Sequence, residues 1–215
     1  YKSAKLNSRP IDKNDFNTAE FHFKKVLEFP ESPVVGYAYY KIGWCNYNRK
    51  QFAKSLLGLE KAVFWALNQN QPNSLITLKT EARRDLISVY AEVGNHLRAI
   101  DYFSQFFRND DASTWILDLA KELETMGQFE KTSDLYRQLM ALSPDSTDSI
   151  KFLLGAIEGS YKLRKWPDVL KQTEELMQRF DIEFKKPREL ASKHVIEAEA
   201  LLRDIITTAH SEFRR

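Results

Sequence analysis

Glycine and proline are scarce in this sequence, with seven of each among 215 residues. An all-β chain of this length needs more turn residues than that, so the scarcity favours helices. The glycines are also dispersed, which argues against a glycine-rich phosphate-binding loop and hence against nucleotide binding. They stand at positions 36, 43, 58, 94, 127, 155 and 159.

Cysteine and long apolar runs are scarcer still. A single Cys45 excludes an internal disulfide and any thiolate metal cluster, but it does not fix the compartment. Because Cys45 follows Trp44 inside a predicted helix, we expect a buried, inert thiol. No apolar run approaches the roughly 18 residues of a membrane span. The chain starts at Tyr1 without a signal peptide, and we expect it to be a fragment of a longer protein.

Charge of one sign is also lacking, since the formal net charge is only +2. No segment is basic enough to indicate a nucleic-acid surface. Residues 101–149 are acidic, and two interpretations of them are open: the solvated faces of helices, which is the simpler one, or a site for a basic partner. The acidic residues considered are Asp101, Asp110, Asp111, Asp118, Glu122, Glu124, Glu130 and Asp134.

Recognisable catalytic motifs are missing as well. The four histidines, at positions 22, 96, 194 and 210, stand in separate stretches with no catalytic motif beside them. No metal-ligand spacing occurs, and adjacent carboxylates such as Glu174 and Glu175 point apart on a helix. We therefore predict neither an enzyme nor a metal site nor a cofactor.

What the sequence does contain is an internal repeat. An aromatic or similar residue is followed by a small residue three positions later and a large apolar one four positions after that. Successive copies begin 36, 44, 33 and 37 residues apart. The five copies are Phe16, Ala19, Phe23; Phe52, Ser55, Leu59; His96, Ala99, Phe103; Phe129, Thr132, Tyr136; and Trp166, Val169, Thr173.

A second helical pattern precedes each of the middle copies, so each repeat is predicted to be a helix A, a tight turn and a helix B. The small residues Gly43 and Ala120 on helix A should face Ser55 and Thr132 on helix B, where the helices approach closely. Gly94 and Gly127 are placed to end helix A in the left-handed conformation. Pro167 suits the first turn of a helix B.

This pattern resembles the tetratricopeptide repeat (TPR) family, most closely between Gly94 and Pro144. The resemblance implies an all-α, right-handed superhelical solenoid of antiparallel helix pairs over residues 1–215. Its predicted repeats are residues 1–33, 34–69, 74–112, 113–146 and 147–183, with a terminal helix at 187–213. Residues 68–79 exceed the period by about ten residues, and they either lengthen the next helix A or form a loop.

Within that family, the segment from Phe29 to Pro33, followed by Tyr39 to Gly43, resembles a bacterial envelope branch. That branch includes the outer-membrane assembly lipoprotein BamD, the Tol-Pal-associated coordinators and gliding-motility repeat proteins. The resemblance implies a periplasmic or envelope-associated scaffold, with a cytoplasmic location as the alternative.

Stacked repeats line one surface with a face of each helix A, and this surface is the predicted binding groove. The groove residues are Tyr37, Tyr40, Trp44 and Tyr47, then Arg84, Ser88, Lys121 and Glu158. The aromatic residues either bind a protein or peptide, as rigid aromatic contact residues do, or pack on a neighbouring helix A. A structural spacer or oligomerisation segment and a glycan-binding helical domain are the alternative functions.

The residues from Arg188 to Phe213 form a last amphipathic pattern, which reads as a helix A without its helix B. It either caps the fifth repeat or presents a free face to another subunit or to the rest of the protein. We predict self-association through Leu202, Ile206 and Phe213.

Overall fold

The computed structural model describes residues 13–68, 74–106, 112–142, 148–180 and 193–214. The chain divides into two compact units, residues 1–94 and residues 95–215. The described residues form helices joined by short turns, with no strand among them. The predicted all-helical fold is therefore confirmed.

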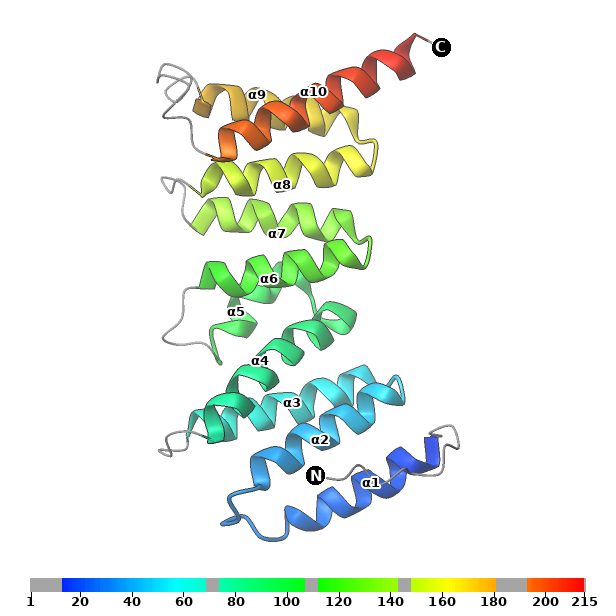
Figure 1. Ribbon diagram of the computed structural model, residues 1–215, viewed down its shortest axis with the longest axis vertical. Helices are drawn as coiled ribbons and strands as arrows, with labels where there is room; N and C mark the ends of the chain where they lie inside the picture. The colour runs from blue at the N-terminus through cyan, green and yellow to red at the C-terminus, as the bar shows by residue number, and fades with distance from the viewer. Residues whose placement is uncertain (1–12, 69–73, 107–111, 143–147, 181–192, 215) are drawn as a thin grey trace, which may run out of the picture. The chain divides into compact units, whose positions relative to one another are not determined.

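The first unit holds four helices, each of which packs on the next along the chain (Figure 1). They are α1 (Lys13–Val26), α2 (Val35–Asn48), α3 (Phe52–Leu67) and α4 (Ser74–Val93). Helix α4 also contacts α2, so α2 has neighbours on several sides. This explains why α2 carries apolar residues around much of its circumference.

The second unit contains the remaining helices. It begins with a short 3-10 helix, η1 (His96–Arg98), and α5 (Ala99–Phe103). The antiparallel pairs α6 (Ala112–Thr125) with α7 (Phe129–Leu142), and α8 (Ser149–Lys162) with α9 (Trp166–Phe180), lie side by side in chain order (Figure 1). Helix α10 (Lys193–Phe213) packs on α8, as a further helix A would.

Three of the helix pairs share one kind of turn, three residues long. In each turn the middle residue has a positive φ: 60° at Lys50, 71° at Gly127 and 57° at Arg164. At the first of these turns, the backbone amide of Gln51 donates to the backbone carbonyl of Asn46 at 2.9 Å. The backbone amide of Lys50 donates to the backbone carbonyl of Tyr47 at 2.8 Å. This is the Schellman arrangement, which satisfies carbonyls at the end of helix A.

The predicted left-handed cap is therefore confirmed for Gly127 and wrong for Gly94, whose φ is not positive. The Gly94 amide instead donates to the carbonyl of Tyr90 at 2.6 Å, which continues the helical pattern. The next turn is closed by Asn95, whose side chain accepts from the amide of Leu97 at 3.0 Å. This different turn leads into η1 rather than into a regular helix B.

The close approach of helices A and B is confirmed, with a shifted register in the first unit. Thr132 donates to the carbonyl of Ala120 at 3.4 Å, as the predicted pairing requires. A Cβ added to Gly43, however, would meet Leu59, and one added to Gly58 would meet the Gly43 backbone at 2.8 Å. The closest contact in this pair thus lies one turn beyond Ser55.

The ten-residue excess between the second and third repeats lengthens a helix. Helix α4 has 20 residues, whereas α2, α6 and α8 have 14 each. Of the excess segment, residues 74–79 belong to α4, and residues 69–73 lie outside the described residues. Pro167 is the second residue of α9, as predicted, and Pro144 lies outside the described residues.

Candidate functional site

In the first unit, the predicted groove residues lie on two neighbouring helices. Tyr37, Tyr40, Trp44 and Tyr47 come from α2, and Arg84 and Ser88 come from α4. These six residues are called the α2/α4 face below. Of the six, Tyr40 is buried, Arg84 is exposed, and the others are half-buried. The structure therefore brings together the candidates that belong to this unit.

The centre of the α2/α4 face is a carboxylate, Asp85 of α4. The Tyr40 hydroxyl donates to Oδ2 of Asp85 at 2.6 Å, and Nε1 of Trp44 donates to the same oxygen at 3.1 Å. The other oxygen, Oδ1, pairs with the Arg84 guanidinium at 3.3 Å. Because Asp85 is only 7% exposed, these donors supply the partners that a buried carboxylate requires.

Aromatic contacts continue from this centre along α2. Trp44 packs edge-to-face on Tyr40 and on Tyr47, with ring centroids 6.5 and 5.2 Å apart, and Tyr47 packs in the same way on Phe52 at 5.5 Å. Such contacts, together with the bond from Trp44 to Asp85, fix the orientation of the rings. The α2/α4 face thus presents rigid, half-buried aromatic side chains beside Arg84, whose side chain is 74% exposed.

Tyr40 requires a correction as a groove residue. It is 7% exposed and its hydroxyl is bonded to Asp85, so it packs between α2 and α4 and is not free to contact a partner. This is the packing alternative that the sequence left open for the aromatic residues. Asp85 was missed because the sequence pattern pointed to its neighbours Arg84 and Ser88. A charged residue within the apolar stretch around Leu86 was the available signal.

Burial and the bond to Asp85 raise the pKa of Tyr40 to about 12, and burial raises that of Tyr136 on α7 to about 12. The unfolded chain loses these protons near pH 10. The folded chain therefore holds more protons between pH 10 and 12, and the free energy of unfolding should fall as the pH rises through this window. Below pH 10 the two phenols make their full contribution to the free energy of unfolding.

Urea unfolding at pH 9 and pH 11.5 measures this loss. We expect the Tyr40→Phe, Tyr136→Phe double variant to lose less stability between the two pH values than the parent chain does. Equal losses in both proteins would show that the two phenols do not cause the alkaline sensitivity.

In the second unit, two of the predicted groove residues lie on α6 and α8. Lys121 on α6 is exposed, and Glu158 on α8 is half-buried. Lys121 pairs with Asp118 at 3.2 Å, and Glu158 lies 4.0 Å from Lys162. Burial raises the pKa of Glu124, which lies one turn after Lys121 on α6, and the charge of Glu158 adds to this effect while Lys162 opposes it.

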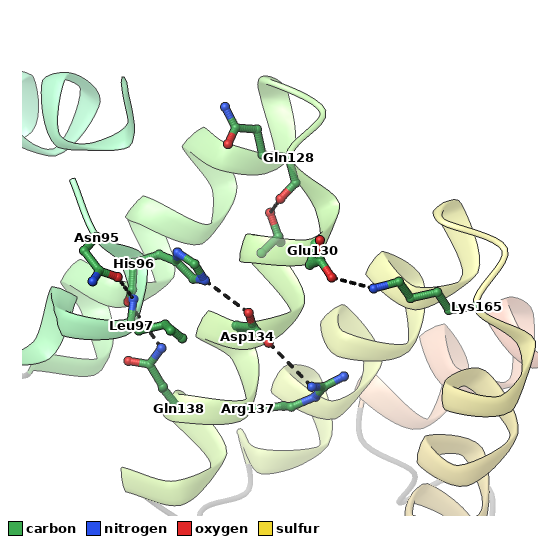
Figure 2. Close-up of polar contacts among 10 residues, drawn as sticks. Asn95, His96, Leu97, Gln128, Glu130, Asp134, Arg137, Gln138 and Lys165 are labelled. Atoms are coloured by element: carbon green, nitrogen blue, oxygen red, sulfur yellow. Dashed lines mark hydrogen bonds and ion pairs between the residues drawn. The ribbon is translucent and has the colours of Figure 1, made fainter. Parts of the chain in front are cut away.

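The polar contacts in Figure 2 join η1 and the α8–α9 turn to α7 within the second unit. Nε2 of His96 lies 3.1 Å from Oδ2 of Asp134 on α7, and Gln138 donates to the His96 carbonyl at 3.3 Å. Farther along, Lys165 in the α8–α9 turn pairs with Glu130 at 2.6 Å. His96, the first residue of the third repeat copy, thus anchors η1 to α7.

The predicted association face on α10 is partly accessible. Ile206 is 67% exposed and Leu202 is half-buried, while the neighbouring Ile205 is 6% exposed. The side chain of Phe213 lies outside the described part of the chain. Tyr161 of α8 donates to Thr208 of α10 at 2.8 Å, which helps to fix α10 on α8. Self-association through this face stays a prediction.

Cys45 is buried, as predicted, and burial raises the pKa of its thiol, which disfavours the reactive thiolate. Among the described residues, no group of three or more His, Cys, Asp or Glu side chains is arranged to hold a metal ion.

The sequence matches no protein-family model and no curated protein. It is similar in structure to the TPR-like repeats of a putative kinesin light chain from Podosopora anserina, with a TM-score of 0.39 and 11% identity, over 80% of this chain and 90% of that one. It is also similar to MamA, with a TM-score of 0.37 and 17% identity, over 81% and 89% of the two chains. The assignment to a TPR-like fold rests on the helix pairs and turns described above.

Proposed function

We propose that this chain is a protein–protein interaction scaffold that binds a protein or peptide segment along the helix A faces of its repeats. The observation that carries the proposal is the α2/α4 face. Its half-buried Trp44 and Tyr47 rings are held in place, and the exposed Arg84 stands beside them. Aromatic and arginine side chains dominate the energetics of protein interfaces, and rings that are already ordered lose little entropy on binding.

A periplasmic or envelope-associated location is proposed on the sequence resemblance alone. No helix in the described part of the chain is long and apolar enough to cross a membrane.

The binding proposal predicts that the variant Trp44→Ala, Arg84→Ala captures less of its native partner. A protein that co-purifies from the native host would first be identified, and its affinity for the purified variants would then be measured. We expect a loss of about tenfold or more, typical of removing interface residues of these types.

The matched control is Phe64→Ala on α3, because Phe64 is an aromatic residue of the same unit that is exposed and lies outside the α2/α4 face. Its affinity should equal that of the parent chain. If Phe64→Ala weakens binding and the α2/α4 variant does not, the partner binds elsewhere and the proposed face is wrong.

A further inference from the structure

Helix α7 shows how one helix of this array receives the next. Ser133 of α7 donates to the Ala156 carbonyl of α8 at 3.2 Å. A Cβ added to Gly155 of α8 would lie 2.4 to 2.7 Å from three atoms of the Tyr136 ring, so α8 lies directly on that ring. The face of α7 that α8 covers is spaced four, three and four residues apart and consists of Phe129, Ser133, Tyr136 and Met140.

The equivalent face of α9 is open within the described part of the chain. Leu170 is 64% exposed, whereas its counterpart Ser133 is 3% exposed. Met177 is 60% exposed, whereas its counterpart Met140 is 9% exposed. Helix α9 therefore presents uncovered apolar side chains where α7 has its neighbour. The residues of this face stand 37 positions after those of α7, at Trp166, Leu170, Thr173 and Met177.

The next helix, α10, packs on α8 and leaves apolar side chains of its own exposed. Tyr161 of α8 donates to Asp204 of α10 at 3.1 Å, which helps to fix this position. Ile196 and Ile206 of α10 are 63% and 67% exposed. At 100° per residue they lie about 80° apart around the helix, and Arg203 stands between them. One side of α10 is thus apolar, exposed and positively charged.

The open face of α9 carries the opposite charge. Glu174 lies within about 60° of both Leu170 and Met177 around the helix. The side chains of Glu174 and Arg203 are exposed, and neither forms an ion pair with another described residue. The two surfaces therefore match in apolar character and in charge. They are called the α9 patch (Leu170, Glu174, Met177) and the α10 patch (Ile196, Arg203, Ile206) below.

We propose that the chain forms a two-fold dimer in which the α9 patch of each copy packs on the α10 patch of the other. In a two-fold dimer every contact occurs twice, so a single arrangement covers both patches of both copies. Each copy contributes four exposed apolar side chains, and their burial drives association. The Glu174–Arg203 pairs determine which patch meets which. The self-association predicted for α10 thereby gains a specific counterpart on α9.

Sedimentation velocity of the 215-residue chain tests the dimer. We expect a monomer–dimer equilibrium at concentrations of about 1 to 100 μM, because an interface of this size is weak. Leu170→Glu and Ile206→Glu should each raise the dissociation constant of the dimer about tenfold or more, since each buries a charge against apolar side chains. A chain that stays monomeric throughout this range overturns the proposal and leaves both patches to a different occupant.

The matched control is Leu57→Glu on α3, because Leu57 is a leucine with 51% exposure that lies in the first unit. Its dimer should be as stable as that of the parent chain. Equal weakening by Leu57→Glu would reflect added charge alone and would overturn the proposed contact. Weakening by Ile206→Glu but not by Leu170→Glu would mean that α10 pairs with another surface, and the contact with α9 would be wrong.

Exchanging the two charges tests the pairing of the patches itself. Glu174→Arg places a second positive charge opposite Arg203, and Arg203→Glu places a second negative charge opposite Glu174. Each variant should therefore dimerise about tenfold more weakly than the parent chain. An equimolar mixture of the two variants should form heterodimers with nearly the parental affinity, because opposite charges then meet at both contacts. A mixture that dimerises no better than its components overturns the proposal.

Discussion

Replacing Gly58 with alanine should destabilise the first unit by about 2 kcal/mol, although the same change at an exposed helical position stabilises by about 1 kcal/mol. The reason is the α2–α3 crossing. A Cβ at position 58 would lie 2.8 Å from the Cα and the amide nitrogen of Gly43. These are backbone atoms, so the clash is relieved only by moving one helix away from the other, and overpacking of this kind costs about 1–3 kcal/mol.

Gly43→Ala is the informative comparison, because a Cβ there meets mainly the Leu59 side chain, at 3.1 Å. A side chain can adjust where a backbone cannot, so this variant should change the stability little. Urea unfolding followed by circular dichroism measures both. A Gly58→Ala variant more stable than the parent chain would show that α2 and α3 do not cross where the structure places them.

Replacing Asp85 with alanine should cost about 3 kcal/mol. The change removes the acceptor shared by Tyr40 and Trp44 and leaves two donors without a partner, one of them on a buried side chain. Each unsatisfied buried group costs about 1–3 kcal/mol. Tyr40→Phe alone should cost less, about 1 kcal/mol, because Asp85 keeps its bonds to Trp44 and Arg84.

The two changes should be coupled. In the Asp85→Ala chain, Tyr40→Phe removes the hydroxyl that Asp85→Ala left unsatisfied, so the double variant should be more stable than the sum of the single losses predicts. The measurement is a double-mutant cycle of unfolding free energies in urea. Strictly additive losses would mean that Tyr40 and Asp85 do not interact in the folded chain.

Much of the fold could be predicted from the sequence because the repeat pattern marks a core position directly. In the copies that start at Phe52, Phe129 and Trp166, a helix B begins at the first residue of the pattern. The left-handed turn residues were only partly predictable. Gly127 is a glycine, but Lys50 and Arg164 adopt the same conformation without the residue type that usually signals it.

The candidate sites were less predictable, because their key contacts join helices through side chains that no periodicity specifies. Asp85 accepts from Tyr40, which lies 45 residues earlier in the chain. Tyr136 was recognised as a repeat position, but the packing of its ring against α8 depends on the missing side chain at Gly155. Such contacts form only when successive helices stack. The sequence pattern does not specify that stacking at the level of single atoms.

Site-specific photo-crosslinking in the full-length protein within its native host would show whether the α2/α4 face contacts the partner. A photoreactive amino acid would replace Tyr47 or Ser88 on the α2/α4 face, or Phe64 on α3 as the control. If this face is the binding surface, the groups at positions 47 and 88 crosslink to the same partner protein and the group at position 64 does not. A partner that crosslinks from Phe64 but from neither Tyr47 nor Ser88 would contradict it.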